Sequence, residues 1–188
     1  HELFKRAVRD YCEKNVAPRS REIDEKEAGI PDDIIKGLAE IGVFGCTIPE
    51  KYGGCALPGE ETQYAVTAIH ELARAELSMS LPVYTLLTIG WGGEFISYYG
   101  NEETKKEVLP KIASGEWSWG ICATEPGGGS DVAAMKAQAI RKGNKFIING
   151  EKAYISQVKE SQQRGGGHRT LFVTDPAKGV KGGMTRLE

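Results

Sequence analysis

The residues best suited to chemistry lie in one short segment, CATEPGGGSD at positions 122–131. Its three consecutive glycines are unfavourable inside a helix or a central strand, so the segment is expected to be a loop. Main-chain N–H and C=O groups are accessible in such a loop, and Thr124 and Ser130 add hydroxyl donors. This composition suits a flat polar ligand lying against the backbone. The alternative is a bulged turn that the hydroxyls cap.

Well-known glycine motifs do not match this segment. A dinucleotide fingerprint GxGxxG and a nucleophile elbow GxSxG both require a small residue at the position of Val132. A P-loop requires Lys-Ser or Lys-Thr after its last glycine, and none of the three histidines offers Ser130 an obvious base. We therefore expect neither a phosphate loop nor a serine nucleophile.

The overall composition is ordinary for a globular protein, since 40% of the 188 residues are hydrophobic and 27% are charged. The net charge of −2 provides no basic surface for nucleic acid or an anionic membrane. The longest uncharged run, Leu77 to Gly93, is interrupted by Pro82 and by glycines, and is shorter than the roughly 20 apolar residues of a membrane span. Charged residues crowd the first ten positions, so no signal peptide is expected.

The four cysteines are not spaced as metal ligands. They include no CxxC pair and have no neighbouring histidine, so we expect no metal site. Reduced thiols in a cytoplasmic setting are the expectation, and Cys122 is expected to be a small buried apolar side chain.

Apolar residues spaced by three and four predict helices up to about Gly115. Pro18 is expected to end or redirect the first helix, and Pro110 to shorten the last one. The expected helices lie near residues 4–12, 31–42, 65–73, 77–99 and 101–112, with a loop at 48–54. Together they predict an N-terminal all-α bundle of about five or six helices over residues 1–116.

From Trp117 onward the pattern changes to that of short strands. The dipeptides Gly143-Asn144 and Asn149-Gly150 favour two-residue hairpin turns, which predicts an antiparallel meander of strands. The expected strands lie at 118–122, 134–140, 145–149, 151–156 and 170–174. Residues 157–168 are expected to form a mobile polar loop, and no helix is expected after the strands. We expect this β domain, residues 117–188, to be incomplete or completed elsewhere.

Three motifs, in the same order, resemble the flavin-dependent acyl-CoA dehydrogenases. That family has Thr-Glu-Pro, two small residues and Gly-Ser-Asp, which here is Thr124 to Asp131. It then has Asn-Gly, a variable residue, Lys, and an aromatic-Ile-Ser/Thr triplet, which here is Asn149 to Ser156. The stretch from Ile48 to Gly54 is similar to a third recurring part of the family. The three motifs cover nearly the whole chain.

The resemblance implies a helical N-terminal domain, an antiparallel β-barrel-like middle domain and FAD as the cofactor. Thr124 would lie near the edge of the isoalloxazine ring, and Ser130 would also contact the acyl-CoA substrate. The acyl tail would run toward residues 88–96, where Gly90, Gly92 and Gly93 would leave room. The implied flavin-contacting positions are Ile121, Cys122, Ala123, Thr124, Gly129, Ser130, Tyr154, Ile155 and Ser156.

The reaction implied is α,β-dehydrogenation of an acyl-CoA thioester to the trans-2-enoyl-CoA. A carboxylate base would take the α-proton while the β-hydrogen leaves as hydride to the flavin, and an electron-transfer flavoprotein would reoxidise the flavin. One alternative is an acyl-CoA oxidase or flavin monooxygenase, which passes electrons to oxygen. Another is a non-catalytic protein that binds flavin and acyl-CoA. The resemblance also favours a homotetramer, in the cytoplasm or, in a eukaryote, the mitochondrial matrix.

Several features depart from the family pattern. Tyr154 replaces the tryptophan of many members, and residues 158–169 form a longer polar stretch. The family's C-terminal helical domain, which carries the catalytic glutamate and much of the FAD and subunit contact, has no counterpart in the 188 residues. No glutamate of this chain is therefore assigned as the base, and these residues alone are expected to be inactive.

The remaining polar and aromatic residues of interest are expected to be structural. Glu125 is expected to be a hydrogen-bonding carboxylate, and Asp131 to cap the glycine turn or to pair with a nearby N–H. His70 is expected to be packed or half-exposed on a helix. Trp117 and Trp119 are expected to pack in the core.

Overall fold

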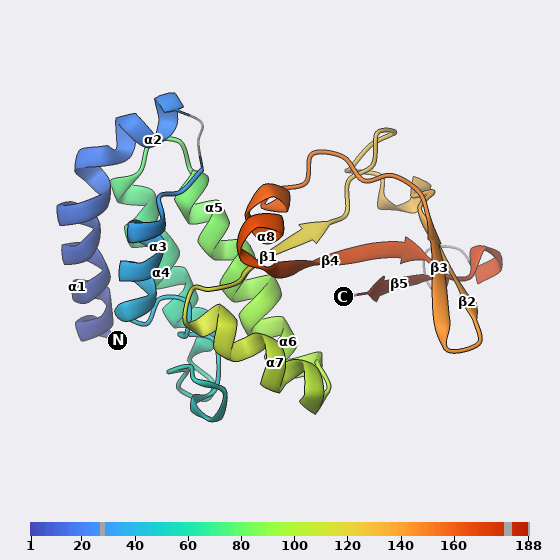
Figure 1. Ribbon diagram of the computed structural model, residues 1–188, viewed down its shortest axis with the longest axis horizontal. Coiled ribbons are helices and arrows are strands. Elements are labelled where there is room, and N and C mark those ends of the chain that lie inside the picture. The colour runs from blue at the N-terminus through green and yellow to red at the C-terminus, as the bar shows by residue number, and fades with distance from the viewer. Residues whose placement is uncertain (27–28, 179–181, 188) are drawn as a thin grey trace.

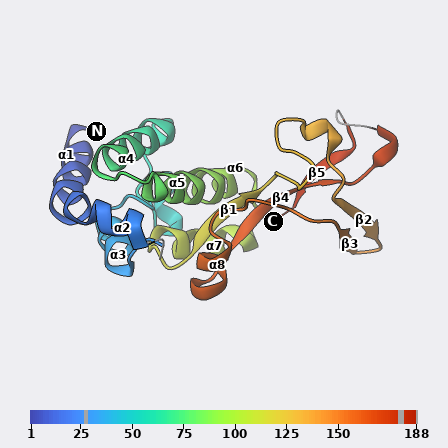
Figure 2. The same ribbon diagram turned by 90° about the horizontal axis from the view of Figure 1, so that it is seen from above.

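The computed structural model describes residues 1–26, 29–178 and 182–187. Most of the helices fill one half of the molecule, and the strands extend into the other half (Figure 1). After a quarter turn the two halves still lie side by side along the long axis (Figure 2). The predicted order, a helical part followed by a sheet, is confirmed.

The first helical stretch changes its winding without breaking. α1 (Glu2–Tyr11) passes through a π turn at Cys12–Val16 and a 3-10 turn at Ala17–Arg19 into α2 (Ser20–Lys26). Pro18 lies in the 3-10 turn, the point at which the winding changes. The chain is therefore redirected at the proline, as expected, and remains helical.

Later helices begin and end at the residues that the sequence marks. α3 (Asp32–Glu40) follows Pro31, and the chain leaves the helix through Gly42, whose φ of 83° favours glycine. α7 (Glu102–Ala113) begins after Asn101, whose side chain accepts a backbone N–H of the first turn. The helix continues past its internal proline to Ala113.

A second continuous helical run passes through the middle of the helical half. It consists of α5 (Ser80–Leu86), a π segment at Leu87–Glu94 and α6 (Phe95–Tyr99), and α4 (Glu61–Ala75) packs beside it. Within the described ranges, no helix has both the length and the apolar character of a membrane span. The fully buried side chains of this first core include Ile34, Leu38, Phe44, Leu72 and Leu81.

A second core joins the helices to the sheet. Trp119 of β1 (Ser118–Cys122) is buried in it, as expected for that tryptophan. A methyl group added at Gly92 would lie 2.7 Å from Trp119 Cβ, so only glycine lets the central helix approach the strand this closely. The apolar partners of Trp119 in this cluster include Ile48, Ile96, Leu109 and Ile112.

The glycines of the central helix differ in their surroundings. A methyl group added at Gly93 would lie 2.6 Å from Thr47 Oγ1, so Gly93, like Gly92, is enclosed by its neighbours. At Gly90, by contrast, no atom lies within 4 Å of an added Cβ. The expectation that Gly92 and Gly93 leave space for an acyl tail is therefore wrong, because both glycines serve close packing.

The described strands form one open, mixed sheet. Its order is β1-β4-β2-β3, and β5 also pairs with β4. β4 runs parallel to β1 and β2, whereas the β2–β3 and β4–β5 pairs are antiparallel. The expectation of an antiparallel, barrel-like sheet needs correction, because the chain crosses over between β1 and β4 and this sheet is not closed. The other strands are β2 (Gln138–Lys142), β3 (Lys145–Asn149), β4 (Gly166–Val173) and β5 (Met184–Leu187).

Only one of the two expected hairpin turns is present. Gly143-Asn144 connects β2 to β3, as predicted. Gly150 instead has a φ of 147°, and a methyl group there would lie 2.6 Å from Ala137 Cα, so it allows a close crossing of the backbone. Residues 151–156 are not a strand, since Tyr154 has a φ of 58° that an extended chain does not adopt.

A short helix replaces most of the expected mobile loop. Residues 157–168 contain α8 (Val158–Arg164) and the beginning of β4, so the expectation of a loop over these residues is wrong. Arg164 donates to Asp32 and to the Ile30 carbonyl, which holds α8 against the helical half. The polar composition of this segment is that of a helix partly exposed to water.

One buried carboxylate ties α1 to α4. Glu71 is 2% exposed and accepts two hydrogen bonds of 2.9 Å from Arg9 and one of 2.8 Å from Arg74. The ring of His70 also lies 3.3 Å from it; His70 lies on a helix, as expected, but its side chain is 63% exposed rather than packed. The bonds from Arg9 first, with those from Arg74 and His70, lower the pKa of Glu71 to about 2, against the opposing effect of burial.

We predict that Gly92→Ala lowers the free energy of unfolding by about 2 kcal/mol, because the new methyl group collides with Trp119 and Ile112. Gly90→Ala, in the same helix, is the matched control. Its methyl group meets open space, so stability should stay equal or rise by about 0.5–1 kcal/mol through the better helix propensity of alanine. Urea-induced unfolding measures both variants, and equal losses would contradict the packing role of Gly92.

We also predict that Glu71→Gln lowers the free energy of unfolding at pH 7 by about 2 kcal/mol, because the bonded carboxylate is buried. The pKa of Glu71 is lower in the folded than in the unfolded protein. Its contribution is therefore complete above pH 4.5 and is lost as the pH falls toward 2. Unfolding curves at several pH values should show the gap between wild type and variant closing over that interval. The surface variant Glu22→Gln is the control, and a gap that persists at pH 2 would contradict the prediction.

Candidate functional site

The glycine segment forms a tight and open turn after β1. Glu125 and Gly128 exchange two backbone hydrogen bonds, of 3.1 Å and 3.0 Å, and Gly128 has a φ of 146° that favours glycine. Around Gly127 and Gly128 no atom lies within 4 Å of an added Cβ, so their backbone faces open space. The expected loop with an accessible main chain is confirmed.

A cleft of about 530 Å³ opens beside this turn. The glycine segment lines one side of it, and residues 134–138 and 149–151 line the others. Bare backbone therefore borders a space large enough for part of an organic ligand.

The Glu125 carboxylate bonds the turn to neighbouring parts of the chain. Its carboxylate accepts hydrogen bonds from the N–H groups of Lys136 (2.8 Å) and Ala137 (2.9 Å) and from Lys152 Nζ (2.9 Å). Burial by itself raises the pKa of this carboxyl, but these hydrogen bonds together bring the pKa below its usual value. The expected structural role of Glu125 is confirmed, and its oxygens are committed to these partners.

Two of the segments expected to contact a ligand lie side by side. The Ala153 N–H donates to the Thr124 carbonyl at 3.0 Å, and Lys152 Nζ donates to the Ala123 carbonyl at 3.2 Å. Farther along, a methyl group added at Gly120 would lie 3.0 Å from the Ser156 carbonyl. The structure thus brings residues 121–124 against residues 153–156, although the β2–β3 hairpin separates them in the sequence.

Gly129 lies close to Thr124, and the hydroxyls of Thr124 and Ser130 have no protein partner among the described residues. A methyl group added at Gly129 would lie 3.2 Å from Thr124 Oγ1. In the part of the chain that the structure describes, neither the Thr124 nor the Ser130 hydroxyl bonds another residue, so both are available to a ligand. Among the described residues the Asp131 carboxylate accepts no hydrogen bond, so it neither caps the turn nor pairs with a nearby N–H, contrary to expectation.

The remaining predicted contacts differ in exposure. Tyr154 is 92% exposed, so its ring does not pack in the sheet. Ile121, Cys122 and Ile155 are half-buried, whereas Ser156 is exposed. Burial raises the pKa of the Cys122 thiol, which therefore stays neutral. All four cysteines are free, and the described residues contain no group of His, Cys, Asp and Glu that could hold a metal.

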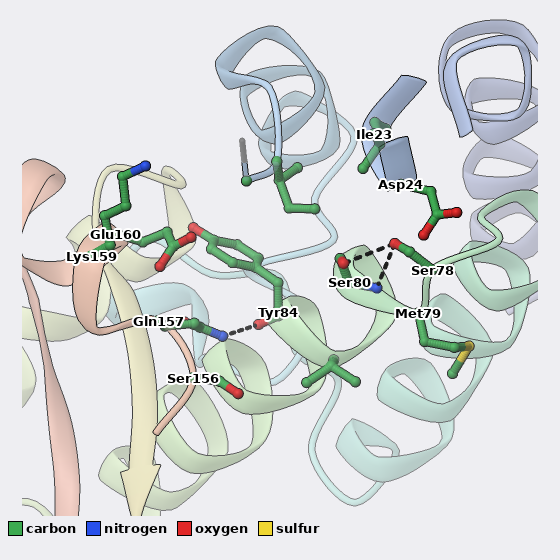
Figure 3. Close-up of a pocket in the computed structure, with 13 residues that line it drawn as sticks. Ile23, Asp24, Ser78, Met79, Ser80, Tyr84, Ser156, Gln157, Lys159 and Glu160 are labelled. Carbon is green, nitrogen blue, oxygen red and sulfur yellow. Dashed lines mark hydrogen bonds between the residues drawn. The ribbon is translucent and has the colours of Figure 1, made fainter. Parts of the chain in front are cut away.

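A second cleft, of about 600 Å³, begins at Ser156 and lies between α2, α5 and the residues leading into α8 (Figure 3). Its charged side chains are two carboxylates, Asp24 and Glu160, and one ammonium, that of Lys159. Its apolar lining comes from Ile23, Ile30, Met79, Val83 and Tyr84. The second cleft thus combines charged side chains with an apolar lining.

Gln157 connects the two halves of the molecule at this second cleft. Its side chain donates to the Tyr84 carbonyl at 2.9 Å, as Figure 3 shows, and accepts from the Thr88 hydroxyl at 3.3 Å. Gln157 is buried and has a backbone φ of 66°, which is uncommon for a residue other than glycine. The sequence predicts a mobile loop at Gln157, and only its position directly after Ser156 indicates another role.

Comparisons with known proteins agree with this arrangement. Residues 1–116 match the family model described as acyl-CoA dehydrogenase, N-terminal domain, and residues 120–184 match acyl-CoA dehydrogenase, middle domain. An acyl-CoA dehydrogenase of Bacillus subtilis (strain 168) is 34% identical over 174 residues, which cover 92% of this chain and 42% of that protein. A 3-(aryl)acrylate reductase of Clostridium sporogenes (strain ATCC 15579) is 33% identical over 187 residues, which cover 97% of this chain and 46% of that protein.

A solved structure gives the same picture in three dimensions. The complex of glutaryl-coenzyme A dehydrogenase with glutaryl-CoA superposes with a TM-score of 0.86 at 30% identity. The superposition covers 98% of this chain and 45% of the other. The chain therefore spans less than half the length of the relatives that it matches.

Proposed function

The chain belongs to the acyl-CoA dehydrogenase family, and on this premise we propose that the protein binds FAD and dehydrogenates an acyl-CoA thioester to the trans-2-enoyl-CoA. Residues 1–116 would form its N-terminal helical domain and residues 117–188 part of its middle domain. The observation that carries the proposal is the contact between residues 121–124 and 153–156 beside an unobstructed glycine turn. When bound, FAD would supply the acceptor for the hydride that leaves the β-carbon.

The residues at the turn fit a flat, polar ring. Open space around Gly127 and Gly128 leaves no side chain in the way of such a ring. The uncommitted hydroxyls of Thr124 and Ser130 provide donors for the polar edge of a flavin, and the exposed ring of Tyr154 is free to cover a face. We propose the remaining contacts at the half-buried strand end and at the triplet that faces it, at Ile121, Cys122, Ala123, Gly129, Ile155 and Ser156.

We propose that Ser130 holds the acyl-CoA and that the acyl group enters the second cleft (Figure 3). That cleft begins at Ser156, one of the proposed flavin contacts, so an acyl chain in it would start next to the ring. Its lining includes Ile23, Val83 and Tyr84, which suit a hydrocarbon chain. A third cleft of about 510 Å³, at Gly90, includes none of the proposed flavin contacts and fits this role less well.

We propose that the carboxylate base lies in a region of the protein that corresponds to the relatives' sequence outside the matched residues. Glu125 is committed to three hydrogen-bond donors, so it is not free to take the α-proton. The matched relatives are more than twice as long as the chain, which leaves ample sequence for the base. We further propose an electron-transfer flavoprotein as the acceptor, a homotetrameric assembly, and a location in the cytoplasm or, in a eukaryote, the mitochondrial matrix.

The proposal is tested on the full-length protein. Titration with FAD should give a yellow complex of defined stoichiometry, and anaerobic addition of acyl-CoA should bleach it. Failure to bind FAD would contradict both the cofactor and the reaction. FAD binding without bleaching by any acyl-CoA would favour the non-catalytic alternative, and rapid reoxidation by oxygen in a stopped-flow experiment would favour an oxidase.

We predict that Thr124→Val weakens FAD binding about tenfold, because one hydroxyl donor to the flavin is lost while the side-chain volume is kept. Ser130→Ala should instead raise the KM for acyl-CoA about threefold to tenfold with little change in FAD affinity. Both residues lack hydrogen bonds to other described side chains, so thermal stability should barely change. Fluorescence titration and steady-state kinetics separate the two effects, and identical phenotypes would contradict the assigned roles.

We predict a preference for neutral over anionic acyl groups. Asp24 and Glu160 outnumber Lys159 in the second cleft, so a terminal carboxylate there meets net repulsion. Pentanoyl-CoA and glutaryl-CoA have the same chain length, and kcat/KM should favour pentanoyl-CoA by about tenfold or more. Asp24→Asn combined with Glu160→Gln should narrow the ratio. An unchanged ratio in this double variant would show that the acyl group does not bind in this cleft.

A further inference from the structure

Lys152 connects the two segments that are proposed to contact the flavin. It is not itself among the proposed contacts. We propose that Lys152 is a positioning residue, which aims the Thr124 N–H at the flavin through the peptide group that Ala123 and Thr124 share. This inference rests on the proposed function and adds a residue to its machinery.

The ammonium group of Lys152 bonds both neighbours of Thr124. Lys152 Nζ lies 3.2 Å from the Ala123 carbonyl oxygen and 2.9 Å from Glu125 Oε1. The side chains of Lys152 and Glu125 are each 10% exposed, so the pair is shielded from water. A shielded ion pair holds its geometry more firmly than a surface pair, since fewer water molecules compete for its partners.

Planarity of the peptide bond transmits this contact to Thr124. In a trans peptide the C=O of one residue and the N–H of the next point in opposite directions. By holding the Ala123 carbonyl, Lys152 therefore turns the Thr124 N–H away from itself. None of the described residues accepts a hydrogen bond from that N–H. The Thr124 N–H therefore has a fixed direction and no acceptor among the described residues, as a hydrogen-bond donor to a ligand requires.

The next peptide group is also held in place. The Thr124 carbonyl accepts from the Ala153 N–H at 3.0 Å, and the Glu125 N–H donates to the Gly128 carbonyl at 3.1 Å. The Glu125 carboxylate in turn accepts from two backbone N–H groups besides Lys152. The whole surroundings of Thr124 are therefore fixed, and Lys152 is the only side-chain cation in that set of contacts among the described residues.

Loss of the ammonium group should free the Ala123 carbonyl and leave Glu125 bonded to backbone donors alone. The Thr124 N–H would then lose its fixed direction. Hydrogen bonds to a flavin tune its electronic properties, so the flavin's absorption spectrum and midpoint potential report whether the donor is still aimed. A merely structural lysine would change stability without changing either property.

The test uses the full-length protein loaded with FAD, in four forms: wild type, Lys152→Met, Lys152→Arg and Glu71→Gln. Lys152→Met keeps the length of the side chain but removes its charge and donors. We expect it to weaken FAD binding about tenfold or more and to shift the visible flavin bands and the midpoint potential. Lys152→Arg keeps a cation that can reach the same two oxygens, so it should restore the spectrum and most of the affinity.

Glu71→Gln is the stability control, because Glu71 lies between α1 and α4 and contacts none of the proposed flavin contacts. It should unfold more easily but keep the wild-type FAD affinity and spectrum. If Lys152→Met does not fold, Lys152→Gln, which keeps an amide donor without the charge, is measured in its place. The inference is overturned if the lysine variants keep the wild-type spectrum, potential and affinity, or if Glu71→Gln alters them equally. A wild-type protein that binds no FAD would instead overturn the proposed function.

Discussion

The close approach of the central helix to β1 is the constraint on which the rest of the structure depends. At Gly92 the helix backbone lies directly against Trp119, and no larger residue fits between them. Thr88, one helical turn earlier, accepts from the Trp119 N–H at 3.4 Å and donates to Gln157 at 3.3 Å. One helix therefore fixes both the strand that leads into the glycine turn and the residue that follows Ser156. The distance between the two proposed flavin-contacting segments is set from that helix.

The polar groups around the turn fall into two kinds. Glu125, Lys152 and the carbonyls of Ala123 and Thr124 are bonded to one another or to nearby backbone. The hydroxyls of Thr124 and Ser130 and the backbone of the glycines remain unbonded and open. Buried polar groups are costly without partners, so the first kind must be satisfied for the loop to hold its shape. The second kind faces open space, where a ligand can bind without first breaking a protein hydrogen bond.

Sequence patterns predicted those parts of the fold that local physics decides. The end of α3 near Gly42 and the start of α7 at Asn101 follow from the local preferences of single residues. The same holds for the turn at Gly143-Asn144. The parallel pairing of β1 with β4 did not follow, because it depends on a crossover that no local pattern marks. Likewise, Gly92 and Gly150 looked like space or a turn, whereas each permits contact with a residue distant in sequence, Trp119 or Ala137.

The candidate site shows the same division. The residue types of CATEPGGGSD predicted an open loop with free hydroxyls, and that much depends only on glycine and on side-chain chemistry. The roles of Gln157 and Lys152 could not be predicted, since their partners at Tyr84, Thr88 and Ala123 become neighbours only when the chain folds. Polar residues that bond distant backbone groups leave no periodic trace in a sequence.

Two buried carboxylates show how one interaction serves different purposes in this fold. Glu71 bonds arginine side chains that are half-exposed, and it joins two helices far from the turn. Glu125 bonds backbone N–H groups and a shielded lysine, and it joins segments that flank Thr124. Hydrogen bonds lower the pKa of both carboxyls, so the pKa alone does not distinguish stability from positioning. The distinction lies in what each carboxylate holds still: a pair of helices in one case, and the direction of an unoccupied backbone donor in the other.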